Sequence, residues 1–202
     1  MHPHDHLRNF QSKVQRVRRL LARQIDLSKS GSLPKTELDA IYELAFLNIF
    51  VAFENDLTEL FKTNMLMSHG SGGQKRSIFV PKTRALADKL LQGTGKYFQI
   101  LPIEQMEKAA RLHFKDGGPF VTLTAAQKDA IGKAYAIRNH IAHRSTEGKK
   151  SYKKKILSQV TLSKPSYSPG YYLKSAIALN RSYFDHHVAE IGGILRDVCE
   201  AS

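Results

Sequence analysis

The sequence predicts an all-α protein, a bundle of five or six helices with a long basic loop before the last helix. Two observations lead to this fold class. Apolar residues recur in steps of three and four along most of the chain, and the stretch 44–53 is apolar on nearly every side, as in a central helix packed all round. The 202 residues contain no internal repeat and no shift of composition, so one domain is expected over residues 1–202.

Each expected element has a local signal. Phe10 to Leu27 is amphipathic, with lysines and arginines on its outer face. Ser32 offers an N-cap to the second helix, and Thr124 to Gln127 has the spacing of a capping box. The segment 145–170 is polar and rich in lysine, which predicts a long connection with room for a short strand or hairpin near 156–162. The expected helices are 10–27, 34–67, 83–91, 103–114, 124–143 and 173–198.

Charge and cysteine content narrow the class of protein. Lys and Arg number 31 against 18 Asp and Glu, a formal net charge of +13. This charge favours a polyanionic partner such as RNA, DNA, an anionic membrane surface or an acidic protein, although a basic surface that only aids solubility also fits. Cys199 alone cannot form an internal disulfide. No segment has the pattern of a signal peptide or a membrane span, so a cytoplasmic protein with no membrane partner is expected.

The most informative segment is 136–143, near the end of the fifth expected helix. At about 100° per residue, Ala130, Ala134, Ile137 and Ile141 form its core stripe. A second stripe on the opposite side contains Gly132, Ala136, Asn139 and His143, and Arg138 lies between the two. The alternative is that Asn139 and His143 are ordinary surface residues, since the helix dipole favours a histidine near a C-terminus.

Small residues let another backbone come close, so the second stripe is suited to packing against a partner helix. If the partner were the same helix of a second chain, a two-fold axis would bring together two copies of Arg138, Asn139 and His143. A homodimer with helices 124–143 near its axis is therefore expected.

Arg138-Asn139-His140-Ile141-Ala142-His143 resembles the R-x4-H signature of the HEPN superfamily, and the apolar stretch 42–54 is similar to the central helix of bacterial HEPN proteins. The resemblance implies a helical bundle that dimerises around the motif. It also implies metal-independent RNA cleavage, often as a toxin neutralised by an antitoxin protein or as an effector of phage defence.

Carried over to this chain, the resemblance assigns Arg138, Asn139 and His143 as catalytic, with Glu54 as a possible supporting acid. The chemistry agrees, because an imidazole can move protons near neutrality and a guanidinium can stabilise a phosphate in the transition state. His140 lies on another side of the helix and is expected to be structural, or at most supporting.

A run of lysines follows the motif and is expected to contact an RNA backbone, unless it is simply a solvated charged surface. These lysines are Lys149, Lys150, Lys153, Lys154 and Lys155. The basic loop 69–76 lacks the residue order of a P-loop. The histidines His2, His4 and His6 lie at an end expected to be floppy, and the adjacent His186 and His187 are expected to diverge. No metal site and no cofactor are therefore expected.

Three functions compete at this point. The first is a metal-independent endoribonuclease that acts on RNA through its 2′-hydroxyl. The second is a non-catalytic HEPN-like module that dimerises or binds nucleic acid, which would not need both Arg138 and His143. The third, a DNA-binding regulator, would need a helix-turn-helix that the sequence does not contain.

Overall fold

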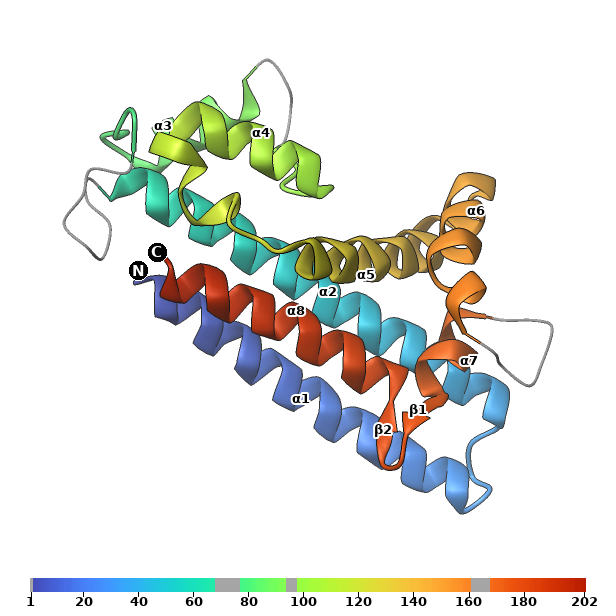
Figure 1. Ribbon diagram of the computed structural model, residues 1–202. Helices are drawn as coiled ribbons and strands as arrows, with labels where there is room; N and C mark the ends of the chain where they lie inside the picture. The colour runs from blue at the N-terminus through green and yellow to red at the C-terminus, as the bar shows by residue number, and fades with distance from the viewer. Residues whose placement is uncertain (1, 68–76, 94–97, 161–167) are drawn as a thin grey trace. The chain divides into compact units, whose positions relative to one another are not determined.

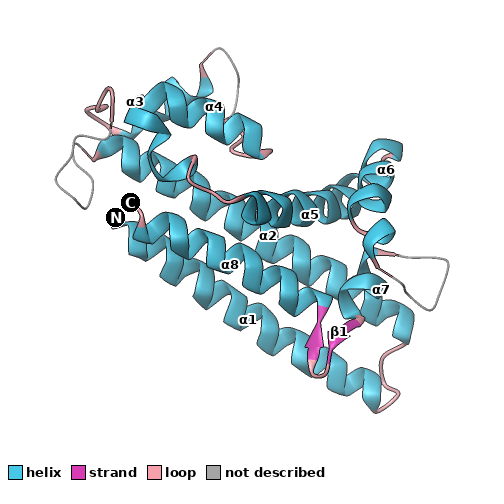
Figure 2. Ribbon diagram, in the orientation of Figure 1, coloured by secondary structure: helices cyan, strands magenta, loops and turns pink. Residues whose placement is uncertain are grey.

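The computed structural model describes residues 2–67, 77–93, 98–160 and 168–202, and within them the chain is all-α, as predicted (Figures 1 and 2). None of the helices described in these ranges combines the length and apolarity needed to cross a membrane. The predicted basic loop 69–76 falls outside the described residues.

The elements are α1 (Pro3–Lys29), α2 (Lys35–Leu66), α3 (Arg84–Gln92), α4 (Ile103–His113), η1 (Lys115–Phe120), α5 (Ala125–His143), α6 (Thr146–Lys155), η2 (Leu157–Gln159), α7 (Pro169–Lys174), β1 (Ala176–Ala178), β2 (Arg181–Ser182) and α8 (Tyr183–Glu200).

The chain divides into two compact units. Unit 1 consists of residues 1–10, 53–128 and 192–202, and unit 2 consists of residues 11–52 and 129–191. The core of unit 1 contains a cluster of aromatic rings, in which Phe61 lies 4.9 Å from Phe114 and 4.6 Å from Phe120. Unit 2 contains the motif predicted from the sequence, so its packing decides how the candidate site is built.

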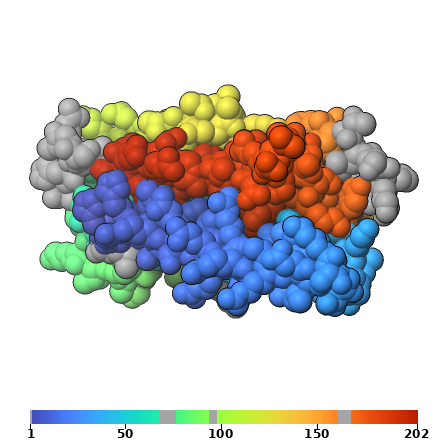
Figure 3. Space-filling view, turned by 90° about the horizontal axis from the view of Figure 1, so that it is seen from below, coloured from blue at the N-terminus to red at the C-terminus, as the bar shows by residue number. Residues whose placement is uncertain are grey.

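The core of unit 2 is built on the first half of α2. Phe46, Ile49 and Phe50 are fully buried there, as the apolar stretch predicts. The Phe50 ring lies 6.3 Å from Tyr135 of α5. In Figure 3, α1 (blue) borders the β1–β2 hairpin and α8 (orange to red), and Arg18 of α1 forms an ion pair with Asp185 of α8 at 3.0 Å. Helices from both ends of the sequence therefore surround the same core.

The segment predicted as a long loop instead contains the helix α6. Ser145 caps it by accepting a hydrogen bond from the Gly148 amide at 3.1 Å. Gly148, Tyr152 and Ile156 are buried and follow one another at intervals of four, which is a helical stripe. The strand or hairpin predicted near 156–162 is also wrong for its described part, because Leu157–Gln159 forms the 3-10 helix η2.

The predicted last helix, 173–198, is divided in two. Its start belongs to α7, and α8 begins only at Tyr183. Between them the chain forms the hairpin β1–β2, with Asn180 at its turn in the left-handed conformation (φ 60°) that asparagine tolerates.

The N-terminus also differs from the expected floppy end. The helix α1 begins at Pro3, and His6 is buried with its Nε2 3.0 Å from Thr63 Oγ1.

Gly170 holds α7 against α2. Its amide donates to Glu43 Oε1 at 3.1 Å, and a Cβ at this position would overlap the carbonyl group of Asp39. Gly170→Ala is therefore expected to lower the free energy of unfolding by about 1–3 kcal/mol, measured by urea denaturation. The matched control is Gly193→Ala in α8, where a Cβ meets open space and stability should rise by about 0.5–1 kcal/mol. Equal stabilities for the two variants would contradict this packing.

Candidate active site

The helix α5 presents the predicted motif at its C-terminal end. It begins with the predicted capping box, in which the Thr124 amide donates to Gln127 Oε1 at 2.8 Å and the Gln127 amide donates to Thr124 Oγ1 at 3.2 Å. Of the predicted core stripe, Ala130, Ala134 and Ile137 are buried, whereas Ile141 is only half-buried. The helix ends at His143, whose side chain is exposed.

Only two residues separate α5 from α6. Arg144 has a positive φ of 45°, which turns the chain, and Ser145 then caps α6. A Cβ on Gly148 would lie 3.4 Å from the backbone of His140, so the first turn of α6 approaches the last turn of α5 closely. The short connection therefore holds the amino end of one helix beside the carboxyl end of the other.

A cleft of about 510 Å³, here called the motif cleft, lies between these two helix ends. It brings together Asn139 and His143, two of the three predicted catalytic residues, and adds the N-terminal turn of α6. Arg138, the third, is not among the residues that line it. The residues around it include Asn139, His143, Ser145, Glu147, Lys150 and Lys154. A helix N-terminus and two lysines outweigh the single carboxylate of Glu147 and favour an anion in this cleft.

Arg138 and Asn139 are linked. The Nη1 of Arg138 donates to Asn139 Oδ1 at 2.9 Å, and both side chains are half-buried. Because a guanidinium only donates hydrogen bonds, this contact fixes the amide of Asn139 with its oxygen toward Arg138. The amide nitrogen of Asn139 is then the group available to donate to a ligand in the motif cleft.

The helical form of α6 separates the five predicted RNA-binding lysines. Lys150 and Lys154 line the motif cleft, one turn apart. Lys149 and Lys153 line a different cavity, described below. Lys155 extends toward Gly132 of α5, with its Nζ 3.3 Å from where a Cβ of that glycine would lie. The expected loop is therefore wrong, because this segment is a helix and about 100° per residue distributes the lysines around it. Contact of these lysines with an RNA backbone stays a prediction.

The two possible supporting residues lie elsewhere. His140 lies beyond the motif cleft, with its ring stacked on Tyr152 at 5.0 Å, and burial lowers its pKa. Glu54 is half-buried on the part of α2 that belongs to unit 1, and its supporting role stays a prediction. Sequence reasoning missed two acids of unit 2, namely Glu147, which lines the motif cleft, and Glu43, one of whose oxygens lies 3.8 Å from Arg144.

The small-residue stripe is less available to a second chain than the sequence suggested. Ala136 is buried in this chain, at 2% exposure, and Lys155 approaches Gly132. At the motif end of α5, the part open to a partner is the last turn, where Ala142 and His143 are exposed. Any two-fold contact between motifs would therefore form at this end of the helix.

His186 and His187 do not diverge as expected. Within the described ranges, one ligand atom of each and one of Glu190 lie within 4.8 Å of one another. Hydrogen bonds already orient these rings, since Arg181 donates to His186 Nδ1 at 3.2 Å and Tyr172 Oη lies 2.8 Å from His187 Nε2. With Nδ1 accepting from Arg181, the proton of a neutral His186 lies on Nε2, facing Glu190 at 3.3 Å. The group thus serves as a hydrogen-bonded cluster at the start of α8.

We compared the chain with protein-family models, curated proteins and solved structures, and none of them matches it. The resemblance to the HEPN superfamily therefore rests on the residues of the sequence alone.

Proposed function

We propose that this protein is a metal-independent endoribonuclease that uses Arg138, Asn139 and His143. The observation that carries the proposal is the motif cleft, where Asn139 and His143 face the same volume as Lys150 and Lys154. A cleft with an imidazole, an amide donor and two lysines against the single carboxylate of Glu147 is suited to a phosphodiester.

The proposed reaction is a transfer within the RNA itself. The imidazole of His143 takes the proton from a ribose 2′-hydroxyl, and the resulting oxygen attacks the adjacent phosphorus. A bond forms between phosphorus and the 2′-oxygen, and the bond from phosphorus to the 5′-oxygen breaks. The leaving 5′-oxygen takes a proton from an imidazolium or from water. The products are a 2′,3′-cyclic phosphate and a 5′-hydroxyl.

The other residues stabilise charge in this reaction. Two negative charges accumulate on the phosphorane oxygens in the transition state, where the guanidinium of Arg138 and the ammonium groups of Lys150 and Lys154 oppose them. Asn139 donates its amide N–H to one of these oxygens. Because the attacking oxygen comes from the substrate, no metal ion is needed to activate a water molecule.

Two oligonucleotides of the same sequence, one RNA and one DNA, test this function in the presence of EDTA. The proposal expects the RNA to be cut and the DNA, which lacks the 2′-hydroxyl, to remain intact. Cleavage of both strands, or cleavage only after magnesium is added, would contradict the proposal.

We also propose that the protein acts as a homodimer whose two motif clefts meet at the exposed end of α5. A second His143 would then lie near enough to protonate the leaving oxygen. Ala142 is exposed beside His143, and Ala142→Glu would place like charges at the two-fold axis. This variant is expected to convert a dimer to a monomer in light scattering at micromolar concentration. A monomeric mass for the unmodified protein would overturn this part of the proposal.

A ribonuclease of this kind needs to be controlled in its own cell. We propose that it is the toxin of a toxin–antitoxin or phage-defence system. The formal charge of +13 suits neutralisation by an acidic, separately encoded antitoxin protein.

The second candidate function is a non-catalytic module that binds nucleic acid. The exposed lysines of α6 favour it, because they would bind phosphates whether or not cleavage follows. The oligonucleotide experiment separates the two functions, since this module would retain the RNA without cutting it.

A further inference from the structure

A second cavity, of about 880 Å³, lies on another side of α6 from the motif cleft. It is built wholly within unit 2, between the first half of α2, the end of α5, and α6 and α7. We call it the α2/α6 cavity. The side chains of its wall that matter here are Glu43, His140, Arg144, Lys149, Tyr152 and Lys153.

Two polar atoms of this wall lack a hydrogen-bond partner among the described residues. They are the hydroxyl of Tyr152 and the Nδ1 of His140. Tyr152 is only 1% exposed, so water does not satisfy its hydroxyl from the surface. Buried polar groups are nearly always paired, since an unpaired one costs about 1–3 kcal/mol. A ligand that accepts hydrogen bonds would supply the missing partner.

The charged side chains around the cavity indicate whether that ligand is an anion or a cation. Arg144, Lys149 and Lys153 are exposed cations on its rim. Glu43 is the opposing carboxylate, and its two oxygens are already engaged by the Gly170 amide at 3.1 Å and by Arg144 at 3.8 Å. The cations therefore outnumber the carboxylate, and the cavity attracts an anion.

The protonation states of the two wall groups fit an acceptor ligand. Burial raises the pKa of Tyr152 above the ordinary value of a tyrosine, so its hydroxyl stays protonated and can donate. Burial also lowers the pKa of His140, which keeps the ring neutral with one N–H. Neither group adds a negative charge that would repel an anion.

We propose that the α2/α6 cavity binds the phosphate group of a small molecule, with Tyr152 donating to a phosphate oxygen and the rim cations neutralising its charge. The terminal phosphate of a monoester or diphosphate carries more negative charge than an internal phosphodiester of RNA. Such a group is suited to the three cations around the α2/α6 cavity. Because the Tyr152 hydroxyl is shut off from solvent, binding needs a local adjustment of the wall. The proposal does not depend on RNA cleavage.

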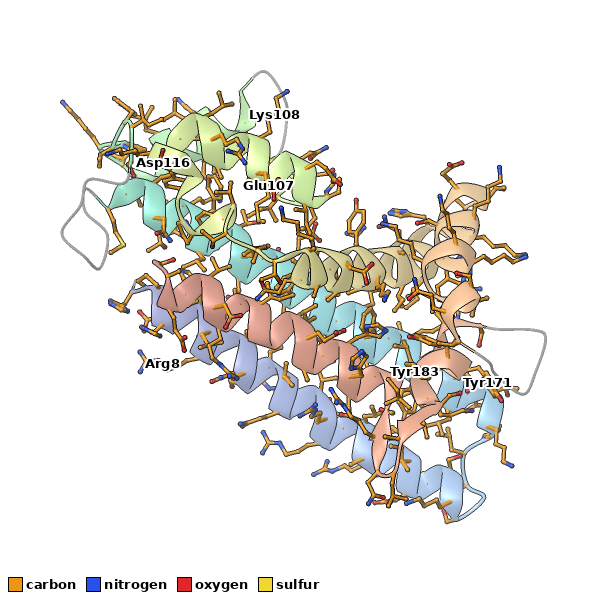
Figure 4. All side chains as sticks on the ribbon, in the orientation of Figure 1. Arg8, Glu107, Lys108, Asp116, Tyr171 and Tyr183 are labelled. Atoms are coloured by element: carbon orange, nitrogen blue, oxygen red, sulfur yellow. The ribbon has the colours of Figure 1, made fainter. Side chains whose placement is uncertain are left out.

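Isothermal titration of the full-length protein with pyrophosphate tests the site. The unmodified protein is expected to bind, and Tyr152→Phe to weaken binding about tenfold by removing one hydrogen bond. Lys153→Gln should weaken binding several-fold. The matched control is Tyr183→Phe at the start of α8 (Figure 4), because Tyr183 stacks on Tyr172 but does not line the cavity. This control should bind pyrophosphate as the unmodified protein does.

Melting temperatures show whether Tyr152→Phe weakens binding by losing a hydrogen bond or by losing its fold. Since the Tyr152 hydroxyl has no partner in the free protein, Tyr152→Phe should melt at or above the temperature of the unmodified protein. Absence of binding by the unmodified protein, or equal binding by Tyr152→Phe, would overturn the proposal. Displacement of pyrophosphate by a 2′-O-methyl RNA without terminal phosphates would assign the cavity to an RNA strand instead, and would overturn the small-molecule assignment.

Discussion

Replacing His143 with alanine is expected to slow RNA cleavage by about 10²–10⁴-fold, which is the usual contribution of a positioned proton-transfer group. His143 is exposed at the end of α5 and contributes nothing to the buried stripe of that helix. The variant should therefore fold and melt as the unmodified protein does. Initial rates on a fluorescent RNA, measured with EDTA present, give the comparison.

The matched control is His4→Ala, which removes another exposed imidazole, on α1 in unit 1. Its rate should equal that of the unmodified protein. If His143→Ala kept more than about a tenth of the rate, proton transfer by His143 would be excluded.

Arg138→Ala is expected to reduce cleavage by about 10²–10³-fold, because removing one donor to the transition-state charge commonly costs that much. The substitution also leaves the amide of Asn139 without the hydrogen bond that orients it. Arg138→Lys retains a positive charge but loses the planar fork of donors, so it should recover only part of the rate.

Circular dichroism melting curves separate catalysis from folding for these arginine variants. Both are expected to remain helical at the assay temperature, since Arg138 is only half-buried. A folded Arg138→Ala protein with an unchanged rate would remove Arg138 from the mechanism.

The helices of this protein were predictable where apolar periodicity was strong. The central stretch of α2 and the capping box of α5 both form as expected, because burial and capping act locally on those residues. The core stripe of α5 was assigned from spacing alone, and three of its four residues, Ala130, Ala134 and Ile137, are buried, while Ile141 is half-buried.

The helix α6 was not predicted, because lysines dominate its sequence and conceal a sparse pattern. Its buried stripe consists of a glycine, a tyrosine and an isoleucine at intervals of four, namely Gly148, Tyr152 and Ile156. The Ser145 cap was the other available signal. The division of α7 from α8 was missed for a different reason, since the turn at Asn180 interrupts residues that individually favour a helix.

For the site, the spacing of Asn139 and His143 was sufficient to place them together, since residues four apart share a helix face. The lysines that join them depend on how α6 packs, which no local pattern specifies. Glu43 and Tyr152 were missed because each becomes significant only through residues distant in sequence, such as Gly170 and His140.

The chemical ends of the RNA fragments test the proposed mechanism most directly. Mass spectrometry of fragments produced in EDTA should find a 2′,3′-cyclic phosphate on one end and a 5′-hydroxyl on the other. The same fragments should be absent when His143→Ala replaces the unmodified protein. Fragments with 5′-phosphate ends, a requirement for magnesium, or unchanged cleavage by His143→Ala would contradict the mechanism.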